Sequence, residues 1–342
     1  MSTFESRGLV DRWLSPGPVV EILDEASVAS ARQSVRAEAA AIGLSSPASE
    51  AAVTAASELT RNLLQHASMP RLFTVRPIVR AGVPGLELMS IDGGPGISDP
   101  TQALAGHAST RGTLGIGLAG TRDLMDELDF DVRLGAGTAI WARKFASPVA
   151  RRREVGMLGR PYPGETVSGD DAWFARGDEG SLLLAVADGL GHGPLAALAS
   201  GPAMATVKQR WSEPLLDIFA AVDRELHGTR GAVMQLLRLD EGTSQLSTVG
   251  VGDTRSYVVD VREARPLPSV PGTLGSKAQG RTRRLEHTSV QAHELLLLAT
   301  DGLSSKASIP PALWAKHPIE IAHQLLLRFG RDNDDVTILV AR

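Results

Sequence analysis

The chain lacks cysteine, has few aromatic residues and contains no long hydrophobic run. Without cysteine, disulfide bridges, zinc-thiolate sites and thiol catalysis are excluded, and a reducing compartment such as the cytoplasm is favoured. The longest uncharged apolar stretch, residues 194–207, is too short to cross a bilayer, and the N-terminus lacks the apolar core of a signal peptide. We therefore expect a cytoplasmic protein with no membrane partner.

Neither sign of charge dominates the sequence. The formal net charge is −4, and neither half of the chain has an excess of lysine and arginine. A basic surface for nucleic-acid phosphates is therefore not expected. The five tryptophans are scattered, which also argues against a platform for stacking bases. We expect no nucleic-acid partner.

The 342 residues, 43% of them hydrophobic, suffice for about two domain cores. The pattern predicts an α+β protein with domains at 1–147 and 161–342, joined by a linker over 148–160 that contains an arginine triplet. In the first domain we expect helices over 25–42, 47–67 and 118–128, and strands over 71–80, 85–91, 129–134 and 138–145. In the second we expect a helix from residue 193, another over 319–329, and strands over 172–175, 181–187, 232–239, 245–249, 256–261, 294–299 and 336–341.

The second expected helix carries a polar pair, Glu58 and Asn62. The two residues are four apart and therefore share one helix face, at the border of the apolar arc. An asparagine carbonyl can bind Mg²⁺, and a nearby carboxylate can take a proton from an attacking hydroxyl. Taken alone, such a pair is most often an ordinary surface pair.

Two glycine-rich segments follow in the first half. Asp92, Gly94 and Gly96 come directly after a strand, where a carboxylate suits a flat ring that bears an amine, although aspartate is also common in tight turns. Gly115 and Gly117 lead straight into a helix, whose exposed N–H groups favour phosphate. No βαβ unit and no Gly-Lys-Ser/Thr sequence accompany them, which excludes Rossmann and Walker A sites.

In this order the three features resemble the N, G1 and G2 boxes of the GHKL ATPase superfamily, over roughly residues 18–145. Residues 115–130 and the following glycine turn look closest to the small serine/threonine switch kinases of bacterial partner switching, the RsbT-like branch. The resemblance implies a Bergerat α/β sandwich that binds ATP and Mg²⁺. It implies that Asn62 holds Mg²⁺, that Glu58 is the general base, and that nucleotide is bound by Asp92, Gly94, Gly96, Gly115, Gly117 and Thr138.

Acidic segments accompany four expected strands of the second half. Mg²⁺ and Mn²⁺ require clusters of oxygen ligands, and two such ions can activate a water for attack on phosphorus. Asp-Gly is also common turn chemistry, but four such segments at strand ends favour a metal site over chance. The segments are residues 168–171, 187–193, 299–302 and 332–337.

This constellation resembles the PPM phosphatase superfamily in its SpoIIE branch, over about residues 155–342, and within that branch the RsbX-like phosphatases. The resemblance implies an αββα sandwich with two Mn²⁺ or Mg²⁺ ions. One aspartate would bridge the ions, with a glycine carbonyl as a further ligand. The implied ligands are Asp188 as the bridge, the Gly189 carbonyl, Asp301 and Asp334 for one ion, and Asp170 or its neighbour Asp171 for the other.

The second half also departs from the phosphatase pattern. Leu190 stands where many members carry a catalytic histidine, and His192, two residues on, is not given that role. Asp335 replaces a frequent asparagine, and we expect it to support the ligands. No arginine is placed by the sequence to clamp a substrate phosphate, and protonation of the leaving group is unassigned.

Together the two resemblances imply a bifunctional partner-switching regulator. It would phosphorylate Ser/Thr of a STAS-domain scaffold or antagonist protein with ATP, and hydrolyse phosphoserine or phosphothreonine at a two-metal site. A sigma factor or a downstream phosphatase would be a further candidate partner. Two alternatives remain: the first half could act as an anti-sigma factor kinase, or it could bind nucleotide without phosphotransfer and gate the phosphatase.

Overall fold

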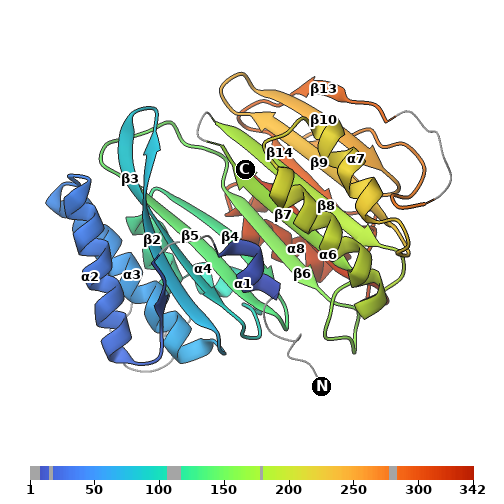
Figure 1. Cartoon of the computed structure of the whole chain (residues 1–342). Coiled ribbons are helices and arrows are strands. Elements are labelled where there is room, and N and C mark those ends of the chain that lie inside the picture. Colours follow the sequence, from blue (N-terminus) through green and yellow to red (C-terminus); the bar gives the residue numbers. More distant parts are fainter. Residues whose placement is uncertain (1–7, 15–17, 106–116, 178–179, 277–282) are drawn as a thin grey trace. The chain divides into compact units, whose positions relative to one another are not determined.

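The computed structural model describes residues 8–14, 18–105, 117–177, 180–276 and 283–342. The chain divides into two compact units, Met1–Glu154 and Val155–Arg342 (Figure 1). Both units combine helices with antiparallel sheets, as the α+β prediction required. None of the helices in the described ranges has both the length and the apolar character needed to span a bilayer.

The N-terminal unit is built on an antiparallel sheet with strand order β1-β2-β3-β5-β4. Strands β2 and β3, which were expected over 71–80 and 85–91, form a long hairpin and pair from Arg71↔Asp92 to Arg80↔Val83. The strands are β1 (Val20–Glu21), β2 (Arg71–Arg80), β3 (Val83–Asp92), β4 (Glu127–Arg133) and β5 (Gly137–Phe145).

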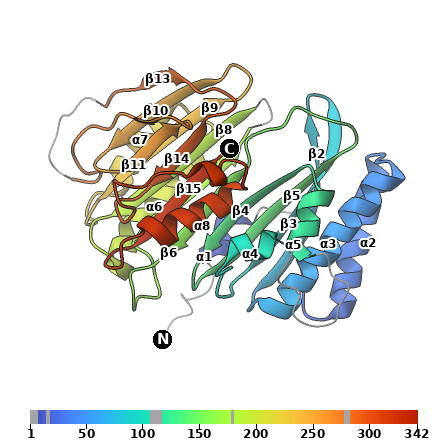
Figure 2. The same cartoon turned by 180° about the vertical axis from the view of Figure 1, so that it is seen from behind.

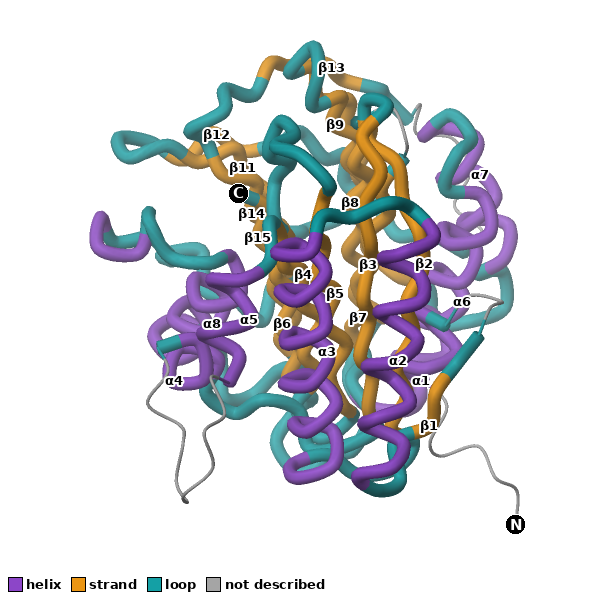
Figure 3. The backbone as a smooth tube through the Cα atoms, turned by 90° about the vertical axis from the view of Figure 1, so that its left-hand side faces the viewer, coloured by secondary structure: helices purple, strands orange, loops and turns teal. Residues whose placement is uncertain are grey.

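Two long helices cover one face of this sheet. They are α2 (Glu25–Ala41) and α3 (Ser46–His66), which lie side by side against β2 and β3 (Figure 3). Their apolar stripes bury residues such as Leu59 of α3 against a sheet face that includes Phe73 and Leu88. Three short helices complete the unit: α1 (Gly8–Trp13), α4 (Pro100–Leu104) and α5 (Gly117–Leu124).

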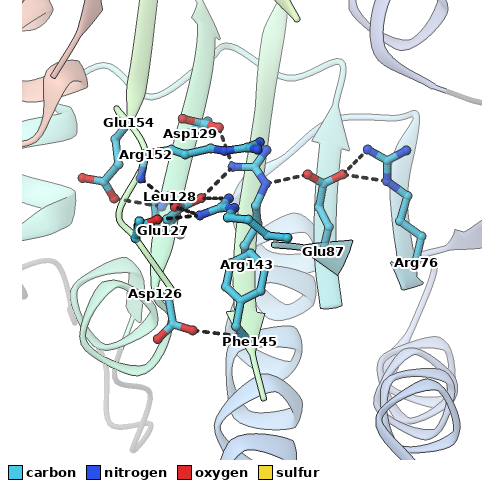
Figure 4. A network of polar contacts seen from close by, with 12 residues as sticks. Arg76, Glu87, Asp126, Glu127, Leu128, Asp129, Arg143, Phe145, Arg152 and Glu154 are labelled. Carbon is cyan, nitrogen blue, oxygen red and sulfur yellow. Dashed lines mark hydrogen bonds and ion pairs between the residues drawn. The ribbon is translucent and has the colours of Figure 1, made fainter. Parts of the chain in front are cut away.

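The opposite face of the sheet carries a buried network of charges (Figure 4). Successive strand residues point to opposite faces, so Glu87 and Leu88 of β3 cannot both face α3. Arg143 of β5 donates from Nε to Glu87 Oε2 at 2.7 Å and from Nη1 to Asp129 Oδ2 at 2.6 Å. This buried network was not expected from the sequence, because charged residues at alternate positions of a strand normally indicate a face exposed to solvent.

The C-terminal unit contains two facing antiparallel sheets, β6-β15-β14-β11-β12 and β13-β10-β9-β8-β7. Helix α8 (Pro318–Phe329) covers the first sheet, while α6 (Gly193–Arg210) and α7 (Leu215–Glu225) cover the second (Figure 2). The first sheet comprises β6 (Val155–Arg160), β11 (Arg255–Val259), β12 (Ala264–Pro266), β14 (Leu295–Ala299) and β15 (Val336–Ala341). The second comprises β7 (Asp170–Arg176), β8 (Ser181–Gly189), β9 (Ala232–Asp240), β10 (Gln245–Val251) and β13 (Glu286–Ser289).

The boundary between the units differs from the linker expected over residues 148–160. Residues 155–160 form β6, which pairs with β15 from Val155↔Ala341 to Arg160↔Val336. Met157 is buried, and Gly156 faces α8 so closely that a Cβ there would lie 2.2 Å from Ile319 N. The arginine triplet and two glycines of this region hid a short strand whose partner lies at the other end of the unit. Helix α7 and strands β12 and β13 were also missed.

Candidate functional site

Helix α3 places the predicted base of the N-terminal unit at the start of α5. Glu58 is only 6% exposed, and its Oε2 accepts a hydrogen bond from Gly117 N at 2.9 Å. Its Oε1 lies 3.9 Å from Nη1 of Arg61. Gly117 has φ 62°, a conformation that favours glycine, and Gly115 lies outside the described residues. Two segments that the sequence singled out separately, the α3 pair and the second glycine segment, therefore meet.

Asn62 lies one turn beyond Glu58 on α3 and is half-buried. Within the described residues its side chain makes no hydrogen bond, so the amide is available to a ligand. The carbonyl oxygen of such a group is a suitable donor to Mg²⁺.

The predicted adenine-binding carboxylate lies at the end of β3. Asp92 is 8% exposed, its Oδ1 accepts from Gly94 N at 2.7 Å, and it pairs across the sheet with buried Thr138. Burial raises the pKa of Asp92 to about 6, although backbone hydrogen bonds from Gly94 and Thr138 favour the ionised form. At neutral pH the carboxylate is an acceptor with room for one more donor, as an exocyclic amine would supply.

The glycines after Asp92 are required by close packing. A Cβ on Gly94 would lie 2.9 Å from Ser68 N, just past the end of α3. Gly96 has φ 76°, and a Cβ there would lie 2.7 Å from Arg133 O. The turn is thus held between the end of α3 and the β4–β5 connection, so Asp92 and the helix that carries Asn62 belong to one region of the unit.

In the C-terminal unit, two of the predicted ligands face each other across neighbouring strands. Asp170 opens β7 and is paired in register with Asp188 near the end of β8. Thr300 donates from Oγ1 to Asp170 Oδ2 at 2.6 Å, and Asp170 is 6% exposed. Asp171 points to the other face of the strand, with Oδ1 accepting from Ala172 N. The structure therefore favours Asp170 over Asp171 as the member of the acidic cluster.

Asp301 and Asp334 complete this acidic cluster. The Asp188 and Asp301 carboxyls lie close enough to interact directly. Burial, followed by repulsion from Asp301 and Asp334, raises the pKa of Asp188 to about 8. The pKa of Asp170 is also raised, by burial and then by Asp188, and that of Asp334 by burial and then by Asp301. The cluster carries more negative charge than its surroundings compensate.

Backbone contacts hold these segments in place. Asp335 accepts from Tyr162 N at 2.7 Å and from Gly169 N at 3.0 Å, which fixes the loop before β7 and agrees with its expected supporting role. Gly189 packs on α6, since a Cβ there would lie 2.1 Å from Ala196 O. Sequence reasoning missed Thr300, whose position directly before Asp301 was the available signal.

The acidic cluster has the donor chemistry of a site for divalent ions. Within the described part of the chain, no three acidic or histidine side chains already enclose a single ion position. The donors are nevertheless all oxygens, as Mg²⁺ and Mn²⁺ prefer, and a divalent cation would relieve the repulsion that now keeps protons on the cluster. The donor set therefore fits such ions, and the ligand assignment remains a prediction.

Both units match protein families and curated relatives. The Histidine kinase-like ATPase domain family matches residues 23–144, and the Stage II sporulation protein E (SpoIIE) family matches residues 178–342. The serine/threonine-protein kinase RsbT of Bacillus subtilis (strain 168) is 35% identical over 126 residues, covering 37% of this chain and 94% of RsbT. The phosphoserine phosphatase RsbX of the same organism is 26% identical over 183 residues, covering 52% of this chain and 89% of RsbX.

Two solved structures are similar to more than half of this chain. A chain from a structure described as "The bacterial stressosome: a modular system that has been adapted to control secondary messenger signaling" is 34% identical. It has a TM-score of 0.52 and covers 56% of this chain and all of its own length. RsbX in complex with magnesium is 22% identical, with a TM-score of 0.50, and covers 57% of this chain and 96% of its own, which supports the fold.

Proposed function

We infer that this chain, which belongs to the histidine kinase-like ATPase family of RsbT through its N-terminal unit, is a bifunctional partner switch. Its C-terminal unit matches the SpoIIE family, with RsbX as a relative. The N-terminal unit would phosphorylate Ser/Thr of a STAS-domain scaffold or antagonist protein with MgATP. The C-terminal unit would hydrolyse the phosphoserine or phosphothreonine so formed.

The observation that carries the phosphatase proposal is the convergence of carboxylates from distant segments. Asp170 faces Asp188 across two strands, and Asp301 and Asp334 lie beside Asp188. Asp188 would bridge two Mn²⁺ or Mg²⁺ ions, with the Gly189 carbonyl, Asp301 and Asp334 on one ion and Asp170 on the other. When bound, such a pair of ions activates a water for in-line attack on phosphorus. Thr300 would keep Asp170 oriented, and Asp335 would hold the loop before β7.

In the N-terminal unit, Asp92 would accept from the adenine amino group, while Gly94, Gly96 and Thr138 shape that end of the site. Asn62 would hold Mg²⁺, and Gly115 and Gly117 would cradle the phosphates. Phosphoryl transfer depends mainly on positioning and charge neutralisation, which backbone N–H groups and a metal ion supply. Glu58 would accept the proton of the substrate hydroxyl.

Asp188→Asn tests the phosphatase proposal. We expect Mn²⁺-dependent hydrolysis of a phosphoserine peptide by the full chain to fall to background, because the bridging charge is lost. Asp332→Asn is the matched control, since Asp332 lies in the same acidic run but is fully exposed, with a side-chain exposure of 100%. Equal activity of Asp188→Asn and the wild-type chain would refute the metal assignment.

One observation favours a second candidate function, nucleotide sensing without phosphotransfer. Glu58 Oε2 already accepts from Gly117 N, and Arg61 lies beside the other oxygen. These contacts occupy part of the carboxylate that a catalytic base would present to a substrate hydroxyl. In the sensing case, nucleotide bound by this unit would change the phosphatase rate.

Asn62→Ala separates the two candidates. For a kinase, we expect ³²P transfer from ATP to a co-encoded STAS protein to be lost while phosphatase activity is kept, and Gln65→Ala, on an exposed position of α3, to change neither. Nucleotide binding by the wild-type chain without transfer to any STAS protein, together with an ATP-dependent phosphatase rate, would establish sensing instead.

A further inference from the structure

The start of β9 lies directly beside the metal-binding end of β8. The register pairs Asp188 with Val233 and Gly189 with Ala232, and the pairing continues one step further, with Leu190 N donating to Gly231 O at 3.0 Å. The residue before Gly231 therefore has to lie next to the loop that follows Asp188. That residue is Arg230, which no sequence motif connects with the acidic segments.

The side chain of Arg230 reaches this loop. A Cβ on Gly191 would lie 2.9 Å from Arg230 Nη1, so the guanidinium occupies the space beside the glycine. Gly191 has φ 95°, which L-residues rarely adopt, and Gly231 has φ 86°. Two glycine turns, one beside each strand, thus bring the Arg230 guanidinium next to Gly191, three residues after Asp188. Leu190 itself is 41% exposed, so the loop is open to solvent.

Arg230 is exposed, and within the described ranges it forms no ion pair or hydrogen bond. Two other arginines lie near the cluster, and of these Arg160 is already paired through its guanidinium. Arg331 lies near enough to Asp334 to oppose the rise in that carboxyl's pKa, and its backbone N donates to Gly302 O. Arg160 is 3.7 Å from Asp332 and donates to the Arg331 carbonyl. Among the described residues Arg230 has no carboxylate or carbonyl partner, and its guanidinium lies beside Gly191 in the loop that follows Asp188.

A phosphate monoester dianion that approaches a cluster of carboxylates meets electrostatic repulsion. Metal ions compensate part of it, and a cation at the rim of the site compensates more. Arginine suits this task better than lysine, because its planar guanidinium can give two parallel hydrogen bonds to two phosphoryl oxygens. The Arg230 guanidinium, which has no partner in the part of the chain that the structure describes, has the charge, the shape and the position for this contact.

We propose that Arg230 binds the phosphoryl group of the substrate of the C-terminal unit, donating to two of its non-bridging oxygens. This inference rests on the proposed phosphatase function and names a binding residue that the sequence left unassigned. Gly191 has a part in the same contact, because a side chain there would displace the guanidinium. The contact forms in the ground state as well as in the transition state, so its loss should raise KM and weaken product binding.

The test measures binding of inorganic phosphate to the Mn²⁺-loaded full chain by calorimetry, which needs no turnover. We expect Arg230→Ala to weaken phosphate binding about 10- to 100-fold, as the loss of a charge-assisted pair of hydrogen bonds would. Arg230→Lys should recover only part of the affinity. Arg328→Ala, at an exposed position of α8, is the matched control and should bind phosphate as the wild type does. Mn²⁺ affinity and the melting temperature should be unchanged in all variants.

Three results would overturn the inference: unchanged phosphate affinity in Arg230→Ala, a larger loss in Arg331→Ala than in Arg230→Ala, or no phosphate binding by the wild-type chain. Hydrolysis of a phosphoserine peptide is measured in parallel, where Arg230→Ala should raise KM more than it lowers kcat. Arg230-dependent phosphate binding without any hydrolysis would refute the proposed function and leave the binding residue standing. Hydrolysis with an unchanged KM in Arg230→Ala would support the proposed function and refute the role of Arg230.

Discussion

Arg143 is the centre of the charge network in the N-terminal unit, and we expect its removal to lower the free energy of unfolding of this unit. Its guanidinium is 5% exposed and bonds both Glu87 and Asp129, with Glu127 3.8 Å away. Removing the Arg143 cation leaves the buried carboxylates of Glu87 and Asp129 with less positive charge to balance them. Breaking a buried ion pair in this way costs about 3–5 kcal/mol, and we expect that loss for Arg143→Ala.

Arg76 provides the matched control, because it bonds the other oxygen of the same carboxylate. Its Nη2 lies 2.6 Å from Glu87 Oε1, but its side chain is 61% exposed (Figure 4). An exposed pair contributes about 0–1 kcal/mol, so Arg76→Ala should change the stability of this unit little. Both substitutions remove a guanidinium that bonds Glu87, but Arg143 is buried and also bonds Asp129, whereas Arg76 is largely exposed.

Hydrogen exchange of β3 and β5 peptides in the full chain, followed over a urea series, isolates the stability of this unit from that of the other. We expect a loss of about 3–5 kcal/mol for Arg143→Ala and less than about 1 kcal/mol for Arg76→Ala. Similar losses in the two variants would show that burial does not set the worth of these pairs, and would refute the reasoning.

The same network predicts how acid affects this unit. Burial raises the pKa of Glu87, but attraction to Arg143 and Arg76 outweighs it, so the folded-state pKa is below the ordinary value. A carboxyl with a lowered pKa adds stability above its unfolded pKa, about 4.3, and loses it as the pH falls through the folded value. The part of the acid sensitivity that comes from Glu87 should therefore shrink in Arg143→Ala.

Two further predictions follow from the candidate sites. The affinity for MgADP should fall about tenfold per pH unit below about pH 6, because Asp92 must then lose a proton before it can accept from the adenine amine. Calorimetry from pH 7.5 to 5 measures this dependence. The same pH profile in Asp92→Asn would contradict the prediction. Gly189→Ala should destabilise the C-terminal unit in urea, since its Cβ would meet Ala196 O at 2.1 Å. An unchanged urea midpoint would show that this close approach does not matter.

Local patterns in the sequence were sufficient to locate most of the regular elements. Strands over 71–80 and 336–341 were predicted with the bounds that the structure shows, because both are short runs rich in β-branched and other apolar residues. Strand β6 was missed because its glycines and the preceding arginines resemble a linker. Its identity as a strand depends on pairing with β15, which lies near the other end of the chain.

The residues of the candidate sites were also predictable in part from the sequence and in part only from the tertiary structure. Glycine turns and strand-end aspartates are local signals, and they led to Glu58, Asn62, Asp92, Asp188 and their neighbours. The choice between Asp170 and Asp171 was open in the sequence, since both are acidic and adjacent. Only the pairing of Asp170 with Asp188 places one of them in the cluster and turns the other away.

By itself the amino-acid sequence determined the two kinds of unit, most of their strands and helices, and the segments in which their chemistry lies. Tertiary structure alone decided which carboxylates meet, that Arg143 joins three strands below the surface, and that Arg230 reaches the Asp188 loop. The physical reason is the range of the interactions. Periodicity and turn chemistry act over a few residues, whereas strand register brings together side chains that are remote in sequence and whose charges then shift one another's proton affinity.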